Sequence, residues 1–124
     1  IKSIPLKVSA PFHCSLMKPA AVHMEKKITN TEFKKPSYQI ITNVTADTEN
    51  DPTRIKKLLV NQIFSTVKWR ESLLKMFNLG AKNFVEIGPG KALSGMVKRT
   101  LKNVNSFSIN TIADIESFNN EFKR

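Results

Sequence analysis

The sequence predicts an α/β fold in which a parallel sheet carries helices on both faces. Two observations lead to this prediction. Short runs of β-branched and aromatic residues alternate with segments whose apolar residues recur every three or four positions. Glycine, proline and helix-capping residues stand between these segments. Because strands that alternate with helices form parallel sheets covered on both sides, αβα layers are expected. Four such strands are also compatible with a larger sheet of which this is an incomplete part.

Composition excludes several other classes of protein. The chain has 124 residues, 40% of them hydrophobic, and carries a net charge of +10. This is too apolar for a disordered tail, and no run reaches the roughly 20 apolar residues of a membrane helix. The start lacks the pattern of a secretory signal, and the single cysteine, Cys14, suits a reducing compartment, so a cytoplasmic protein is expected. With no repeat or linker, residues 1–124 are expected to form one piece without a second domain.

The first third of the chain should form a strand, a helix and a second strand. Residues 4–9 alternate in polarity and end before a proline, which indicates a strand and a turn. From Cys14 onward the apolar spacing predicts a helix, with Pro19 in its first turn. Residues 38–44 are rich in β-branched side chains and predict a strand, whereas the polar residues 45–51 predict a loop.

Two helices are expected in the middle of the chain. Asp51 followed by Pro52 is a strong helix start, with the aspartate as N-cap. Gln62 falls on the apolar face of this helix, so its side chain should point inward. Packing of the amide in the interior is by itself enough to explain this placement. The next helix runs from Trp69 and should stop at Gly80, which readily adopts a left-handed conformation.

The last third should repeat a strand and a helix. Residues 84–87 predict a strand, and the glycines that follow predict a tight turn before a helix with its apolar stripe over 93–101. Residues 104–109 predict another strand. Thr111 and Asp114 have the spacing of a capping box and should start the final helix.

His13 is the main candidate for chemistry. It follows a predicted strand and precedes a predicted helix, and ligands of open α/β sheets bind at this edge. A neutral imidazole can take a proton from a hydroxyl nucleophile and return it to a leaving group. A surface or structurally bonded histidine is the alternative. His13, His23 and Cys14 lack the number and spacing of zinc ligands, so no metal is expected. No cofactor is expected either.

The turn at Gly88 to Lys91 invites comparison with a phosphate-binding loop. Val85 and Leu93 stand where the nucleotide-binding patterns need glycine, so a plain tight turn is predicted. No G-x-S-x-G stretch occurs in the 124 residues, so a serine hydrolase or acyltransferase would need its serine from elsewhere.

The positive charge admits a second class of function. Lysines and arginines are spread over most predicted helices, which is typical of solvated faces. A partial patch from Lys91 to Lys102 could still steer an acidic partner. A non-catalytic basic module that binds an acidic protein or nucleic acid is therefore the alternative to an enzyme.

Four blocks of sequence closely resemble bacterial malonyl-coenzyme A:acyl carrier protein transacylases. The first is the histidine motif VSAPFHCSLMKPA at Val8–Ala20. The others agree in order and spacing: Thr42–Val44, Leu59–Ile63 leading to Val67–Trp69, and Glu86–Leu93. The resemblance that these blocks mark extends over nearly the whole chain.

The resemblance implies an acyltransferase fold similar to the α/β-hydrolases and a role in fatty acid synthesis. Members of the family move malonyl from coenzyme A to acyl carrier protein by a ping-pong route through a serine ester. His13 matches the family's histidine, which activates the serine and protonates the leaving thiolate. Gln62 matches the residue whose backbone carbonyl orients that histidine. Asn43 and Lys91, within two of the blocks, are the candidate substrate-binding residues.

The resemblance also has limits. In the family, the serine, the oxyanion-hole glutamine and the arginine for the malonyl carboxylate belong to upstream sequence. The chain therefore resembles the C-terminal part of the larger α/β subdomain and should be inactive alone. Its expected partners are malonyl-CoA, acyl carrier protein and the remainder of the same enzyme, with neither nucleic acid nor membrane. A different acyl group stays an alternative within this fold, whereas a general esterase is disfavoured because no acidic partner for the histidine stands in a recognisable position.

Overall fold

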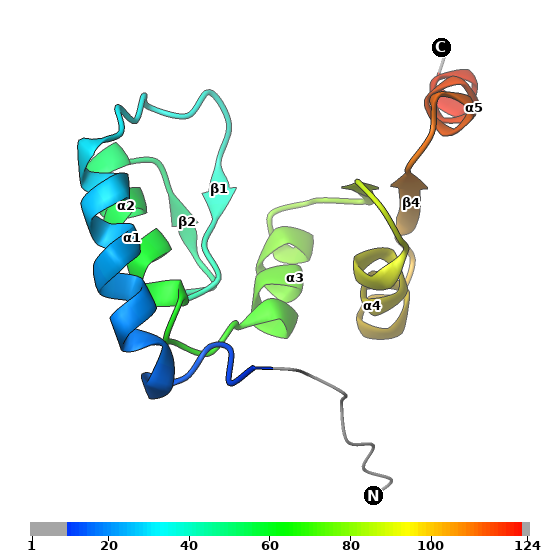
Figure 1. Cartoon of the computed structure of the whole chain (residues 1–124). Helices are drawn as coiled ribbons and strands as arrows, with labels where there is room; N and C mark the ends of the chain where they lie inside the picture. Colours follow the sequence, from blue (N-terminus) through cyan, green and yellow to red (C-terminus); the bar gives the residue numbers. More distant parts are fainter. Residues whose placement is uncertain (1–9, 123–124) are drawn as a thin grey trace, which may run out of the picture. The chain divides into compact units, whose positions relative to one another are not determined.

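The structure is a computed structural model in which residues 10–122 are described. The chain folds as two compact units, residues 1–72 and 73–124 (Figure 1). The elements are, in chain order, the 3-10 helix η1 (Ser15–Met17), α1 (Lys18–Asn30), β1 (Ile40–Ile41), β2 (Thr48–Glu49), α2 (Pro52–Gln62), α3 (Trp69–Asn78), β3 (Asn83–Ile87), α4 (Ala92–Thr100), β4 (Asn105–Ile109) and α5 (Ile112–Phe122).

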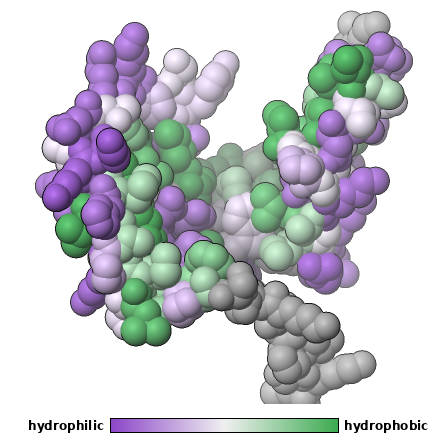
Figure 2. All heavy atoms as spheres, viewed as in Figure 1, coloured by the Kyte–Doolittle hydropathy of each residue, from purple (hydrophilic) through white to green (hydrophobic). Residues whose placement is uncertain are grey.

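The first unit is built on a pair of helices. α1 packs against α2, and the two lie side by side in the left half of Figure 1. Both helices begin as predicted, because Pro19 lies in the first turn of α1 and Pro52 in the first turn of α2. Ala21 and Ile55 are buried on these helices, whereas the exposed side of α1 is mostly hydrophilic (Figure 2). The apolar spacing thus marks the buried face only in part, because Met24 of α1 belongs to it and is exposed.

The strand predicted over 38–44 is much shorter in the structure. Only Ile40–Ile41 is a strand, and it pairs antiparallel with Thr48–Glu49, which the sequence predicted as loop. Two backbone bonds close the turn between them: the Thr42 amide donates to Asp47 at 3.1 Å, and Ala46 donates to Thr42 at 2.9 Å. The polar residues of this segment favour a tight hairpin over a longer strand. The strand predicted over residues 4–9 lies outside the described residues.

The second unit contains the parallel sheet. β3 and β4 pair in parallel over five residue pairs, from Asn83 with Asn105 to Ile87 with Ile109. Side chains alternate along a strand, and helices lie on both faces: α4 packs against β3 and β4, and α5 packs against β4. Phe107 of β4 meets Phe118 of α5 edge to face, with ring centres 5.3 Å apart. The predicted αβα layering is confirmed, with two parallel strands among the described residues.

Helix α3 ends close to the predicted position. Its last residue is Asn78, and Gly80 follows with φ of +96°, a conformation that side chains with a Cβ atom rarely adopt. Leu73 of this helix is fully buried. Within residues 10–122, no helix is both long enough and apolar enough to cross a membrane.

Candidate active site

His13 lies in a tight turn that leads into η1 and α1. The turn is closed by the Phe12 amide, which donates to Ala10 at 2.9 Å, and by the Cys14 thiol, which donates to Pro11 at 3.1 Å. His13 itself has φ of +57°, in the left-handed region. Non-glycine residues in this region cost about 1 kcal/mol or more, and such strain often occurs at functional sites. The turn therefore fixes His13 in an unusual backbone conformation and presents its exposed side chain.

The ring of His13 is held by the backbone of Gln62. Nδ1 lies 2.7 Å from the Gln62 carbonyl oxygen, across 49 residues of sequence. A carbonyl oxygen only accepts hydrogen bonds, so Nδ1 must carry the hydrogen and donate it. In the neutral ring, Nε2 then keeps its lone pair. The geometry thus selects the tautomer that can take up a proton at Nε2.

The carbonyl of Gln62 is free to accept this bond because of its position in α2. Gln62 is the last residue of the helix, where backbone carbonyls have no partner within the helical ladder. The C-terminal end of a helix also carries partial negative charge, which stabilises a nearby cation by about 0.3–1 kcal/mol. When Nε2 takes a proton, the positive charge of the imidazolium faces this helix end.

Asn43 reaches Gln62 from the hairpin. Its side-chain Nδ2 donates to Oε1 of Gln62 at 3.0 Å, and both residues are half-buried. The backbone carbonyl of Asn43 accepts from the Lys68 amide at 2.9 Å. The structure therefore brings three predicted site residues, His13, Gln62 and Asn43, into one hydrogen-bonded chain.

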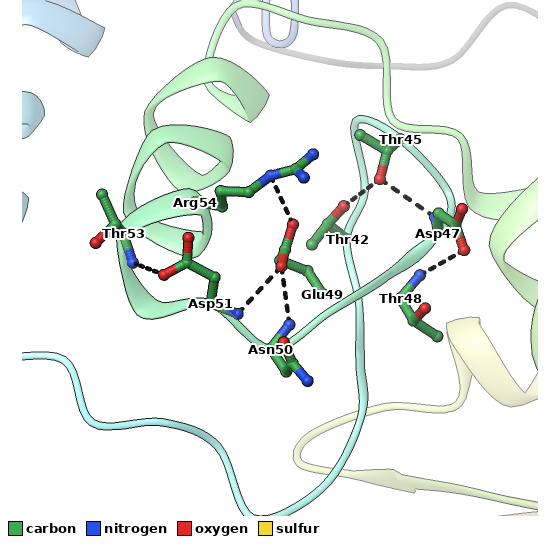
Figure 3. Close-up of polar contacts among 9 residues, drawn as sticks. All are labelled: Thr42, Thr45, Asp47, Thr48, Glu49, Asn50, Asp51, Thr53 and Arg54. Carbon is green, nitrogen blue, oxygen red and sulfur yellow. Dashed lines mark hydrogen bonds and ion pairs between the residues drawn. The ribbon is translucent and has the colours of Figure 1, made fainter.

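Polar contacts hold the hairpin to the start of α2 (Figure 3). The Glu49 carboxylate accepts from the backbone amides of Asn50 and Asp51 and pairs with Arg54 at 2.9 Å. Asp51 caps the helix as predicted, since its carboxylate accepts from the Thr53 amide at 3.0 Å. The hairpin and α2 are thereby linked at both ends of the helix.

A cavity of about 250 Å³ lies beside the Asn43–Gln62 pair. Apart from these two amides and Thr42, its lining is aliphatic, from β1 and α2: Ile40, Ile41, Ile55, Leu58 and Leu59.

Lys91 belongs to the second unit, where it is the N-cap residue of α4 and is exposed. The turn before it is the predicted tight one, and Gly88 and Gly90 have φ of +133° and +100°, which explains the need for glycine. The amides of Asn110 and Thr111, the Thr111 hydroxyl and the charge of Lys91 hold the pKa of Asp114 below its usual value. Lys91 thus interacts electrostatically with an acidic residue of its own unit.

Glu86 forms the main polar cluster of the second unit. Its carboxylate accepts from the amides of Leu93 and Ser94, at 3.2 and 2.8 Å, and from the Ser94 hydroxyl. The Ser94 hydroxyl and amide, with the Leu93 amide, lower the pKa of Glu86, although partial burial acts in the opposite direction. A carboxylate bonded in this way at the start of a helix stabilises that helix.

No group of three or more histidine, cysteine or acidic residues is placed to hold a metal ion within the described part of the chain.

Known proteins are similar to this chain in both sequence and structure. The malonyl CoA-acyl carrier protein transacylase of Haemophilus influenzae is 38% identical over 118 residues, which cover 95% of this chain and 37% of the relative. An acyl carrier protein S-malonyltransferase from Vibrio cholerae has a TM-score of 0.87 at 38% identity, over 94% of this chain and 38% of the solved one. The chain is similar to the C-terminal part of malonyl CoA-acyl carrier protein transacylases.

A solved complex adds a partner to this comparison. It contains a malonyl-transacylase with its type II PKS acyl-carrier protein, and its transacylase is 33% identical with a TM-score of 0.85, over 92% of this chain and 37% of that one. No family model matches the sequence. The chain spans little more than a third of the length of the transacylases it matches.

Two features of this chain were not predicted from the sequence. One is the side-chain hydrogen bond between Asn43 and Gln62. The resemblance had marked Asn43 only as a candidate substrate-binding residue. The other is the cluster of Glu86 with Ser94. The spacing from Glu86 at the end of a strand to the first turn of the next helix was a signal for the second contact, because free amides at a helix start attract a carboxylate.

Proposed function

We propose that this chain supplies the catalytic base of a malonyl-CoA:acyl carrier protein transacylase acting in fatty acid synthesis. The observation that carries the proposal is the 2.7 Å hydrogen bond from His13 Nδ1 to the Gln62 carbonyl. It leaves Nε2 available as a base in a chain that is 38% identical to a named transacylase.

The proposed reaction has two half-reactions. A serine hydroxyl from the remainder of the enzyme attacks the malonyl thioester while Nε2 of His13 takes its proton. The bond to sulfur then breaks, and the imidazolium returns the proton to the coenzyme A thiolate. In the second half-reaction Nε2 takes the proton of the carrier protein's thiol, whose sulfur attacks the malonyl-serine ester. The serine regains its proton as the ester bond breaks.

In this reaction Gln62 orients the base and is not itself a reacting group. A backbone carbonyl takes the place that a buried carboxylate has in many serine enzymes. It fixes the ring by accepting from Nδ1, and it lies at the helix end that stabilises the imidazolium. Any residue at position 62 provides a carbonyl, so the identity of the side chain matters only through what holds the helix end in place.

Charge and composition support the same partners. Malonyl-CoA and acyl carrier protein are both anionic, and a chain with a net charge of +10 attracts them at long range. Exposed lysines on α1, Lys18, Lys26 and Lys27, contribute to this field. With its single cysteine, the chain also suits the reducing cytoplasm, where we place the reaction.

The test fuses this chain to the part of a related transacylase that lies outside the region of similarity. A hybrid in which the 124 residues replace the C-terminal part of the Haemophilus influenzae relative should transfer malonyl from malonyl-CoA to acyl carrier protein. The 124-residue chain alone should give only background. A folded hybrid without transfer would contradict the proposed function, and turnover by the chain alone would contradict the assignment of the serine to other sequence.

A further inference from the structure

The bond between Asn43 and Gln62 connects a hairpin to the carbonyl that holds His13. Nδ2 of Asn43 donates to Oε1 of Gln62 at 3.0 Å, and the backbone oxygen of Gln62 accepts from His13 at 2.7 Å. Asn43 and Gln62 are 19 positions apart in the sequence, and His13 and Gln62 are 49 positions apart, so neither bond is local. Gln62 is the shared member, and it is bonded through its side chain on one side and its backbone on the other.

The two ends of this connection differ in how firmly they are held. Asn43 lies next to the closed turn of the hairpin, in which Thr42 bonds Asp47 and Ala46 through its backbone and Thr45 through its hydroxyl at 2.6 Å (Figure 3). Gln62, in contrast, is the last residue of α2, and helix ends fray. The cavity of about 250 Å³ beside it leaves room for its side chain to turn away.

We propose that Asn43 is a positioning residue, which anchors the end of α2 through the side chain of Gln62 and so keeps the Gln62 carbonyl in place for His13. The inference rests on the proposed function of His13 as a base. Asn43 acts through Gln62, and its effect is to keep His13 in the tautomer with hydrogen on Nδ1. This is an alternative to the substrate-binding role that the resemblance suggested for Asn43.

The experiment follows the ring proton of His13 by nitrogen-15 NMR in the full-length protein that carries this chain. In the unaltered protein the neutral ring should hold its proton on Nδ1, and this proton should exchange slowly with water. Asn43→Ala should accelerate the exchange about fivefold, the effect of one hydrogen bond of ordinary net strength. Asn61→Ala is the matched control, because Asn61 is the exposed neighbour of Gln62 on the same helix, and it should leave the exchange unchanged.

A double-mutant cycle shows whether Asn43 acts through Gln62. Gln62→Ala alone should accelerate the exchange as much as Asn43→Ala, and the double variant should add nothing further. Additive effects, or an unchanged exchange rate in folded Asn43→Ala, would overturn the inference.

A second pair of variants covers the case in which Asn43→Ala does not fold. Gln62→Glu keeps an oxygen that can accept from Asn43, whereas Gln62→Leu removes it. The exchange should stay slow in the first and become about fivefold faster in the second. Equal rates in these two variants would overturn the inference.

Kinetics separate this inference from the proposed function. If the protein transfers malonyl, Asn43→Ala should lower kcat about fivefold with KM unchanged, as expected when only the base is misplaced. A raised KM with unchanged kcat would instead restore a substrate-binding role for Asn43. If the protein transfers no malonyl, the proposed function fails, and the exchange of the His13 proton still decides the role of Asn43.

Discussion

The two units of the chain use opposite ends of a helix. In the first, His13 donates a hydrogen bond to the free carbonyl of Gln62 at the C-terminal end of α2. In the second, the Glu86 carboxylate accepts bonds from free amides at the N-terminal end of α4. Each side chain has the polarity that its helix end favours, a donor at the negative end and an anion at the positive end.

The two arrangements differ in which hydrogen-bonding atoms of the side chain they leave free. Glu86 takes up the Leu93 and Ser94 amides and the Ser94 hydroxyl, and this hydroxyl also meets Ser108 at 2.6 Å. The Glu86 oxygens thus hold β3 to α4, and the Ser94 hydroxyl extends this contact to β4. His13 uses one nitrogen for the helix end and keeps the other for a proton. The same physical device serves stability in the second unit and, as proposed, chemistry in the first.

The largest effect should come from removing the imidazole of His13. In the active hybrid or full-length protein, His13→Ala should lower kcat/KM for malonyl transfer about 10³-fold, because the serine loses its base and the thiolate its acid. Amide exchange in β4, a measure of local stability, should stay unchanged. His23→Ala, at an exposed position on α1, is the control and should keep full activity. A fall of less than tenfold in His13→Ala would argue against His13 as the base.

Removing the Ser94 hydroxyl should lower the stability of β4 and preserve malonyl transfer, which is the reverse of the pattern expected for His13→Ala. Ser94 is buried, and Ser94→Ala should lower the opening free energy of β4 amides by about 2 kcal/mol, since several partners lose their bond. Malonyl transfer at low temperature should persist. Ser117→Ala, at an exposed serine of α5, is the control.

The acid dependence of stability should change in the same variant. The pKa of Glu86 is lowered in the folded protein, so its contribution to stability is present above the usual value of 4.5 and is lost as the pH falls through the lower folded pKa. The Ser94 hydroxyl is the largest cause of this lowering. Ser94→Ala should therefore flatten the loss of β4 protection below pH 4.5. An unchanged slope would show that Glu86 does not depend on Ser94.

The second unit was the more predictable of the two from sequence. Its signals are local: glycines at the turn have positive φ, and the capping box forms as predicted, with Thr111 donating to Asp114 at 2.8 Å and accepting from it at 3.3 Å. A short stretch of sequence contains all the residues of each such motif, so spacing and residue type are sufficient to predict it.

The first unit depends on contacts that no short stretch contains. The pairing of Ile40–Ile41 with Thr48–Glu49 could not be seen in the polar run that forms the second strand. His13 was singled out by its place at the end of a predicted strand, whereas its contact with Gln62 was predicted only from the resemblance. The bond from Asn43 to Gln62 was not predicted at all. Such bonds depend on how distant segments pack, which periodicity and propensity do not describe.

The smallest effect should come from the far end of α2, and it decides what holds the Gln62 carbonyl. Asp51→Ala removes the N-cap and should destabilise the helix by about 1 kcal/mol in a denaturant titration, whereas Asp51→Asn should keep most of the cap. The cap lies roughly 15 Å from Gln62 along the helix. If Asn43 anchors the C-terminal end, malonyl transfer and His13 proton exchange should not change in Asp51→Ala at a temperature where the protein is folded. If both change as much as in Asn43→Ala, the carbonyl is positioned by the stability of the whole helix, because a local anchor cannot respond to a cap three turns away.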